Sequence, residues 1–243
     1  MSPAESAGTV VSGQVLVVQN TPHGGPGRVG AWLRAAGLDL RVLRPYDGES
    51  LPASLSGRPL VVLGGAYLPD DDARAPWLPA TRGLVSEALA ESVPLLGICL
   101  GGQLLAQVAG GSVRGAHGRP EFGSTTIRLR PEAAGDPLLH GFGATVPAIE
   151  RHVDAITELP PGAAWLASSD TCPHQAFRVG ERAWGVQFHP EADPERIAGW
   201  DRDALAARGL DREAMHARAV AEDGAATAAW SVFTERFAGL CAV

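Results

Sequence analysis

The hydrophobic positions of this chain follow two patterns, which change near Thr125. In the first half, short apolar runs end in glycine or polar turns, which is typical of strands buried on both faces. The strands predicted here cover residues 15–19, 38–43, 60–63 and 94–99. Apolar residues at helical spacing lie between them and predict helices at 29–36, 77–90 and 101–109. Strands that alternate with helices in this way indicate a mostly parallel sheet covered by helices.

The segment after Thr125 has strand patterns that follow one another more closely, with short turns between several of them. The predicted strands cover residues 125–129, 145–149, 163–168, 175–179 and 184–188. We expect them to form a smaller antiparallel extension that returns the last strand to the central sheet. Two helical segments, 194–208 and 213–237, follow. The predicted fold class is therefore α/β, with a mostly parallel central sheet, flanking helices and this antiparallel β extension.

The length of the chain bounds its organisation. A chain of 243 residues suits one large domain and leaves little room for a second hydrophobic core. We therefore predict a single domain over residues 14–243, preceded by a flexible N-terminus at 1–13. The last part of the domain, 211–243, is expected to be a helical extension packed on the rest.

Composition and charge exclude several classes of protein. A net charge of −7 and a pI near 5.5 argue against binding of nucleic acid or of anionic membranes, since both need clustered Lys and Arg. No run approaches the roughly 20 apolar residues that span a bilayer, and residues 1–13 lack the pattern of a signal peptide. Three scattered cysteines do not form a disulfide framework, and their odd number suits a reducing compartment. We expect a cytoplasmic protein.

Cys99 lies where a predicted strand meets a predicted helix. The local sequence, Gly97-Ile-Cys99-Leu-Gly101, has the layout of a nucleophile elbow. The glycines are needed because side chains would collide as the chain reverses over the strand. The partial positive charge of the helix N-terminus favours the thiolate, and the N–H of Leu100 can donate to a developing oxyanion. A structural cysteine buried in a glycine-rich turn would give the same local pattern.

His189, Pro190 and Glu191 end the last predicted strand. A thiolate nucleophile needs an imidazole within hydrogen-bond reach, and the imidazole needs a carboxylate on its other nitrogen. If this strand lies beside the strand of Cys99, all three groups meet at the C-terminal edge of the sheet, where ligands bind in open α/β sheets. Two other interpretations of this motif remain. His189 could be an isolated surface histidine, or His189 and Glu191 could be two ligands of a metal ion, although the spacing suggests no third ligand.

The two motifs together resemble the signatures of class I, triad-type glutamine amidotransferases. They read Gly-Ile-Cys99-Leu-Gly-Gly-Gln103 and Gly-Val-Gln-Phe-His189-Pro-Glu191, and the histidine lies 90 positions after the cysteine. The similarity is to the glutaminase domain of GMP synthase and its stand-alone relatives, and it covers residues 15–196. It implies a flavodoxin-like fold, no cofactor, and a catalytic triad of cysteine, histidine and glutamate.

The resemblance also implies the positions that stabilise the oxyanion. In this family, a Gly-Gly-Pro turn after the third strand supplies one N–H group, which by position is that of Gly65. Here Ala66 replaces the proline, which leaves that N–H in place. The second N–H is that of Leu100, so an oxyanion formed by attack of Cys99 on a γ-carboxamide would lie between the two.

Substrate-binding residues follow from the same resemblance. Gln103 would contact the bound glutamine, and Glu121 lies in a Glu-x-Gly stretch that the family shares. Arg151 and His152 lie in a segment that resembles the family's Ser/Trp-His-x-Asp, which helps to hold the amino-acid end of the substrate. Arginine thus stands where the family has serine or tryptophan.

Several features have no role in this scheme. The run Asp70–Asp72 could suggest a Mg²⁺ site, but a charge run after a turn is typical of a solvated loop, and no metal is expected. Cys172 and Cys241 lack an elbow or a nearby base in sequence and are expected to be inert. His23 lies near the same sheet edge, where it could contact substrate or simply be a loop residue.

Three functions compete at this point. The first is a glutaminase that hydrolyses L-glutamine and passes ammonia to a separate synthetase, because the chain has no room for a synthetase domain. The second uses the same triad, without a partner, to hydrolyse γ-glutamyl amides or peptides. The third is a non-catalytic regulatory relative, against which the intact Cys99, His189 and Glu191 argue.

Overall fold

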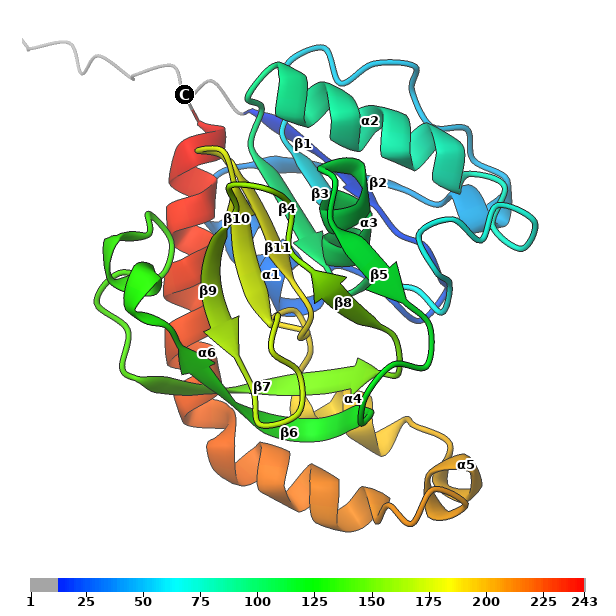
Figure 1. Cartoon of the computed structure of the whole chain (residues 1–243), viewed down its shortest axis with the longest axis vertical. Coiled ribbons are helices and arrows are strands. Elements are labelled where there is room, and N and C mark those ends of the chain that lie inside the picture. Colours follow the sequence, from blue (N-terminus) through cyan, green and yellow to red (C-terminus); the bar gives the residue numbers. More distant parts are fainter. Residues whose placement is uncertain (1–12, 243) are drawn as a thin grey trace, which may run out of the picture.

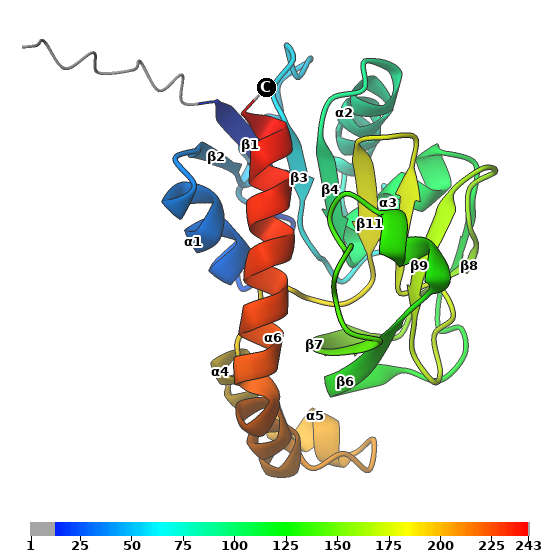
Figure 2. The same cartoon turned by 90° about the vertical axis from the view of Figure 1, so that its left-hand side faces the viewer.

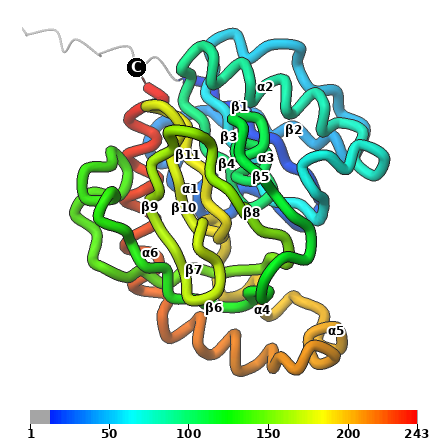
Figure 3. The backbone as a smooth tube through the Cα atoms, viewed as in Figure 1, coloured from blue at the N-terminus to red at the C-terminus, as the bar shows by residue number. Residues whose placement is uncertain are grey.

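A computed structural model of the chain describes residues 13–242. The predicted flexible N-terminus at 1–13 lies outside this range, apart from Gly13. Figure 1 shows one large twisted sheet with helices on both of its faces, and the backbone trace in Figure 3 follows the same path.

The central sheet has nine strands, and the predicted α/β fold is confirmed. In spatial order the strands are β2 (Asp39–Leu43), β1 (Gln14–Val18), β3 (Leu60–Val62), β4 (Leu95–Ile98), β11 (Ala183–Val186), β10 (Ala176–Val179), β9 (Ala164–Ser168), β6 (Glu121–Leu129) and β7 (Thr145–His152). The first five pair in parallel and the last four are antiparallel. The antiparallel strands therefore continue the parallel sheet and bring β11 back beside β4, as the sequence pattern predicts.

A second, two-stranded antiparallel sheet was not predicted. It pairs β5 (Ser112–Arg114) with β8 (Ala155–Glu158). Both strands are short and lie between predicted elements, so their hydrophobic pattern does not stand out from the neighbouring turns.

Helices cover the two faces of the sheet in pairs. On one face lie α1 (Gly27–Ala35) and α6 (Arg212–Cys241), and on the other lie α2 (Leu78–Ala90) and α3 (Leu100–Val108). The alternation of β1 matches this arrangement, because Val15 and Val17 pack toward α1 and α6 whereas Leu16 and Val18 pack toward α2 and α3. Two 3₁₀ turns follow β2 and β6, namely η1 (Pro45–Asp47) and η2 (Pro131–Gly135).

The predicted helix at 194–208 is two short helices, α4 (Pro194–Ala198) and α5 (Arg202–Ala206). The break falls at Trp200, whose side chain is 5% exposed and packs in a small core with Ile149 and Leu205. Asp201 then starts α5 by accepting hydrogen bonds from the backbone N–H groups of the next turn. Burial of the indole thus overrides the helical pattern.

The last helix, α6, is a single element of 30 residues that runs along the molecule from top to bottom (Figure 2). Arg28 on α1 forms a bidentate ion pair with Asp223, at 2.7 and 3.0 Å. The indole of Trp230 donates a hydrogen bond to the carbonyl of Pro147 on β7, at 2.9 Å. These contacts hold α6 against helix α1 and against the antiparallel strand β7.

Candidate active site

Cys99 occupies a strained turn between β4 and α3. Its backbone has φ 51° and ψ −107°, a region that non-glycine residues rarely adopt. The flanking glycines allow this turn: a Cβ on Gly97 would lie 2.4 Å from the carbonyl oxygen of Gly101, and one on Gly101 would lie 2.0 Å from that of Val62. The thiol is therefore held at the tip of the strand, at the N-terminus of α3.

His189 reaches Cys99 because β11 lies directly beside β4. The parallel register pairs Val186 with Ile98, and the backbone N–H of Cys99 donates to the carbonyl of Val186 at 2.8 Å. His189, three residues further on, is fixed by a backbone hydrogen bond to Ile149 on β7. A Cβ built on Gly64 would lie 3.0 Å from Cε1 of His189 and 3.4 Å from Cβ of Cys99. The two side chains therefore lie next to each other in front of Gly64.

The carboxylate of Glu191 contacts the Nδ1 atom of the His189 imidazole. Nδ1 of His189 lies 2.8 Å from Oε1 of Glu191, whose side chain is almost completely buried. Burial alone would lower the pKa of His189, but the negative charges of Glu191 and Cys99 raise it well above its usual range. Burial would raise the pKa of Glu191, but the charge of His189 and the hydrogen bond to it lower that pKa. The arrangement thus favours an imidazolium beside the sulfur and an ionised carboxylate behind it.

Arg196 on α4 links this carboxylate to the loop after β1. Its guanidinium lies 3.8 Å from Oε1 of Glu191 and donates to the carbonyls of His23, at 2.8 Å, and Gly25, at 3.4 Å. The backbone N–H of Arg28 donates to the carbonyl of Glu191 at 2.9 Å. Sequence analysis missed Arg196, since a lone arginine on a helix gives no signal of such a contact.

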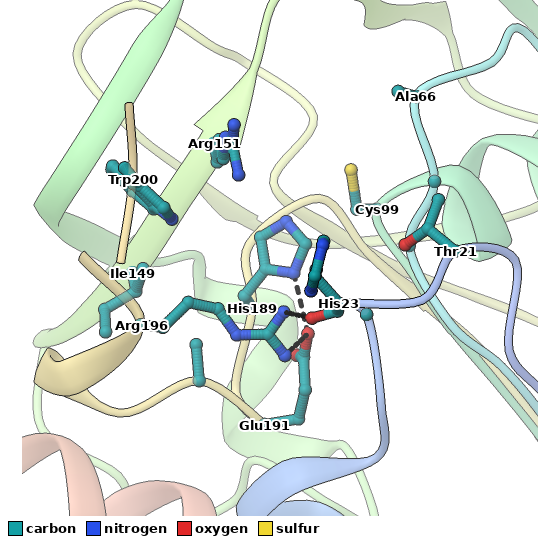
Figure 4. A pocket seen from close by; sticks show the side chains of 14 residues that line it. Thr21, His23, Ala66, Cys99, Ile149, Arg151, His189, Glu191, Arg196 and Trp200 are labelled. Atoms are coloured by element: carbon teal, nitrogen blue, oxygen red, sulfur yellow. Dashed lines mark hydrogen bonds and ion pairs between the residues drawn. The ribbon is translucent and has the colours of Figure 1, made fainter. Parts of the chain in front are cut away.

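Two cavities open on either side of Cys99. The first, about 290 Å³, extends past His189 to Thr21, His23, Arg196 and Ile149. The second, about 330 Å³, extends toward Gln103, Arg151 and His152, and α5 forms part of its wall. The linings of both cavities include Gly65, Ala66, Cys99, Arg151 and Trp200. Figure 4 shows Arg151 and Trp200 across the first cavity from Cys99.

The predicted oxyanion positions flank the thiol. Leu100 is the first residue of α3, so its N–H has no acceptor within the helix. Gly65 lies against it, since a Cβ there would be 2.8 Å from a methyl group of Leu100. Asn20 supports the turn through a hydrogen bond from its amide to the carbonyl of Leu63, at 2.8 Å, and accepts one from the indole of Trp77.

Gln103 lies in the lining of the second cavity but is already hydrogen-bonded within the protein. Its amide donates to Oε1 of Gln187, at 3.1 Å, and to the carbonyl of Asp154, at 3.3 Å. Gln187 in turn directs its amide at the sulfur of Cys99, at 3.6 Å. Gln187 was not predicted, although it lies in the same motif as His189. Gln103 and Gln187 are therefore a buried, hydrogen-bonded pair next to the thiol of Cys99.

The other predicted substrate residues separate into two groups. Arg151 and His152 both line the second cavity, whereas Glu121 lines neither cavity. Glu121 lies 3.1 Å from Nε2 of His152 and accepts hydrogen bonds from Ser169 and Gln175, each at 2.7 Å. Burial would raise the pKa of Glu121, but the hydrogen bonds to His152 and Ser169 lower it. Glu121 is therefore placed to orient His152 from behind.

The remaining cysteines differ from Cys99. Cys172 is buried, and its sulfur lies near the carboxylate of Glu121 and the imidazole of His152, with the donor atoms within 4.8 Å of one another. This donor set could hold a metal ion, although both partners already have hydrogen bonds in the protein. Burial raises the pKa of Cys172 to about 12, and that of Cys241 also to about 12. Neither thiol is therefore a nucleophile at neutral pH.

The acidic run after β3 is engaged in ion pairs. Asp71 contacts Arg74 at 2.7 Å, and Asp72 contacts Arg82 at 2.8 Å.

Within residues 13–242, no helix has the length and apolar character to cross a membrane.

Comparison with known proteins agrees with this geometry. Residues 31–198 match the family model described as glutamine amidotransferase class-I. Over 148 residues the chain is 41% identical to a glutamine-hydrolyzing GMP synthase of Porphyromonas gingivalis, a match that covers 60% of this chain and 27% of that protein. It is 45% identical over 101 residues to one subunit of the glutamine-hydrolyzing GMP synthase of Sulfolobus acidocaldarius, which covers 41% of this chain and 52% of that one. The chain thus spans only part of the length of these relatives.

Solved structures give a more complete match. A glutamine amidotransferase from Thermotoga maritima superposes with a TM-score of 0.81 at 25% identity, over 93% of this chain and 98% of that chain. A glutamine amidotransferase from Methylobacillus flagellatus gives a TM-score of 0.77 at 25% identity, over 94% of each chain. The likeness therefore includes α6 and the antiparallel strands as well as the parallel half of the sheet.

Proposed function

Because this chain belongs to the class-I glutamine amidotransferase family, as its motifs predict, we propose that it hydrolyses glutamine through a cysteinyl thioester and releases ammonia for a separate acceptor enzyme. The observation that carries the proposal is the strained elbow of Cys99 beside the hydrogen-bonded pair His189 and Glu191. A structural cysteine would not require this backbone strain, and a surface histidine would not require a buried carboxylate behind it.

Each group then has a role in the reaction. The sulfur of Cys99 attacks the γ-carboxamide carbon, and the oxyanion is held by the N–H groups of Gly65 and Leu100. His189 gives its proton to the departing nitrogen, which leaves as ammonia. The neutral imidazole then takes a proton from a water molecule that attacks the thioester, so that glutamate is released and the thiol is restored. Glu191 orients His189 and stabilises the imidazolium in the steps where His189 carries the proton.

We assign the glutamyl part of the substrate to the second cavity. Arg151 and His152 line it, and Asp154 offers a carboxylate for an α-ammonium group. Gln103 would contact the chain of the substrate from the floor of the cavity. Glu121 would act through His152, to which it is bonded, and not by touching the substrate.

The acceptor of ammonia is proposed to be another chain. The relative from Sulfolobus acidocaldarius is named as one subunit of GMP synthase, which is a precedent for a glutaminase carried on its own polypeptide. The acceptor enzyme of this chain would dock near the opening of the cavities, where ammonia leaves. We propose that this partner is a separate synthetase chain.

Ammonia and glutamate release from L-glutamine tests the proposal. We expect steady turnover by the wild-type chain and none by Cys99→Ala, whereas Cys172→Ala, the matched control, keeps activity within about twofold because its thiol is protonated and buried. A glutamine-mimicking chloroketone should label Cys99 alone. Equal activity in wild type and Cys99→Ala would rule out the thioester mechanism.

A further inference from the structure

A buried cluster of titratable side chains lies in the antiparallel part of the sheet, behind the second cavity. Glu121 on β6 pairs directly with His152 on β7, and Glu150 lies two residues before His152, on the same face of that strand. Cys172, between β9 and β10, completes the cluster. These four residues come from three separate segments, so their spacing in the sequence gives no zinc motif.

The imidazole of His152 directs a lone pair at two carboxylates. Its Nδ1 lies 3.1 Å from the carbonyl oxygen of Asp154, which can only accept, so Nδ1 carries a hydrogen. In the neutral ring Nε2 is then an acceptor, yet it lies 3.1 Å from Oε2 of Glu121 and 3.6 Å from Oε2 of Glu150. Acceptors that face one another repel unless positive charge lies between them, as a second proton on the ring or as a metal ion.

The carboxylate of Glu150 favours the metal ion over the proton. Its side chain is fully buried, and neither of its oxygens has a hydrogen-bond partner within the described part of the chain. A proton on Nε2 of His152 would serve Glu121, at 3.1 Å, and would leave Glu150 without a hydrogen bond. A divalent ion, in contrast, can bind both carboxylates and the imidazole at once.

The donor atoms of the cluster are those that zinc binds. Two carboxylate oxygens, an imidazole nitrogen and a sulfur give the four ligands of a closed structural site. In a tetrahedral zinc site the ligand atoms are roughly 3.3–3.6 Å apart, close to the two distances from Nε2 of His152 to the carboxylates. The sulfur of Cys172 lies within 4.8 Å of the donor atoms of Glu121 and His152, so it has to move inward by up to about 1 Å on binding.

The surroundings of the cluster also suit a metal site. Metal ligands in proteins are held in place by hydrogen bonds from a second layer of groups. Here Ser169 and Gln175 each donate to Glu121 at 2.7 Å, and the Nδ1 hydrogen bond fixes the ring of His152. A further cavity, of about 100 Å³, has both His152 and Cys172 in its lining and gives an ion a route to the cluster.

We infer that Glu121, Glu150, His152 and Cys172 bind one Zn²⁺ ion with a structural role. The thiol releases its proton to solvent on binding and coordinates as the thiolate. The ion joins β6 and β7 to the segment that carries Cys172, and thereby stabilises the antiparallel part of the sheet. This inference stands apart from the proposed hydrolysis of glutamine, since it is tested by metal binding and not by turnover.

Cobalt provides the test, because a bond between Co²⁺ and a thiolate gives a charge-transfer band in the near ultraviolet. The protein is the full chain with Cys99→Ala, which removes the thiol that lines the other two cavities, and it is first treated with a chelator. We expect one Co²⁺ per chain with this band, and its displacement by one equivalent of Zn²⁺. Adding Cys172→Ser should abolish the band, whereas Cys241→Ser, the matched control with another buried thiol, should keep it.

The variant Glu150→Gln tests the orphaned carboxylate with little change in shape. It should weaken Zn²⁺ binding, measured by competition with a chelating dye, by about 10–100-fold. The metal-free variant should be at least as stable as the wild type, because a buried group without a partner is removed, so Zn²⁺ should raise the Tm of the wild type more than that of the variant.

Three results would overturn the inference. Absence of the Co²⁺ band would mean that protons alone neutralise the cluster. A band that survives Cys172→Ser would place the metal elsewhere. If Cys172→Ser does not fold, Glu150→Gln decides, since an unchanged affinity for Zn²⁺ would exclude Glu150 from the site.

Discussion

Gly64 offers a sharp test of how Cys99 and His189 work together. A methyl group on Gly64 would lie 3.0 Å from Cε1 of His189, whereas ordinary contacts begin near 3.4 Å. The imidazole must therefore retreat from Gly64 by about 0.4 Å or more in Gly64→Ala, which changes its position relative to the sulfur. Since a misplacement of about 1 Å can cost about 100-fold in rate, we expect kcat/KM for glutamine to fall by about tenfold.

The assay is steady-state glutamine hydrolysis together with thermal unfolding. The retreat of His189 requires no change in the core, so the Tm of Gly64→Ala should stay within a few degrees of the wild type. Gly83→Ala is the control: it also adds one methyl group, in helix α2, but meets nothing within 4 Å, so activity should be unchanged and the helix slightly stabilised. Activity within twofold of the wild type, at an unchanged Tm, would refute the placement of His189 against Cys99.

Three further predictions concern charge. In Glu191→Gln the negative charge that raises the pKa of His189 is lost, so the imidazolium should deprotonate at lower pH. The alkaline limb of the pH profile of kcat/KM should move to lower pH, with a rate loss on the order of 100-fold or more because acid–base catalysis is impaired. An unmoved limb would contradict this. Arg196→Met frees two loop carbonyls and removes a cation that lowers the pKa of Glu191, and kcat should fall severalfold, with partial recovery in Arg196→Lys. Asp136→Ala removes a buried acceptor of the Trp184 indole. Calorimetry should show that the free energy of unfolding falls by about 3 kcal/mol, which corresponds to a Tm lower by roughly 6–12 °C. A fall below about 1 kcal/mol would mean that the structure around Asp136 relaxes to compensate for the lost acceptor.

Much of the fold was predictable because the strands of its parallel half have clear local patterns of apolar residues and glycines in the sequence. The run at 60–63 is apolar on both faces and ends in two glycines, and the structure has β3 there. The elbow was predictable in part for the same reason, since Gly97 is required by a contact with Gly101, four residues away, whereas Gly101 is required by Val62 on the neighbouring strand β3. The prediction that the chain resembles class I glutamine amidotransferases is confirmed.

The details that failed depend on contacts between distant residues. The helical pattern at 194–208 has a single glycine and no proline after its first residue to mark a break, but burial of Trp200 divides it. The roles of Gln187 and Arg196 likewise come from side chains that meet only when β11 and α4 are in place. Glu121 shows the opposite case: its motif was recognised, yet hydrogen bonds turn its carboxylate away from both cavities.

The central position of β11 has a consequence for how the protein is made. Strands β1 to β4 can pair as soon as they are synthesised, whereas the neighbour of β4 arrives about 90 residues later, after the whole antiparallel extension. During that interval β4 presents an unpaired edge of apolar residues, which is a template for strands of other chains. Damage to the antiparallel extension should therefore appear first as aggregation of newly made protein, with normal activity in the molecules that finish folding. The same delay keeps Cys99 apart from His189 until nearly all of the sheet has formed, so a partly made chain lacks the assembled candidate site.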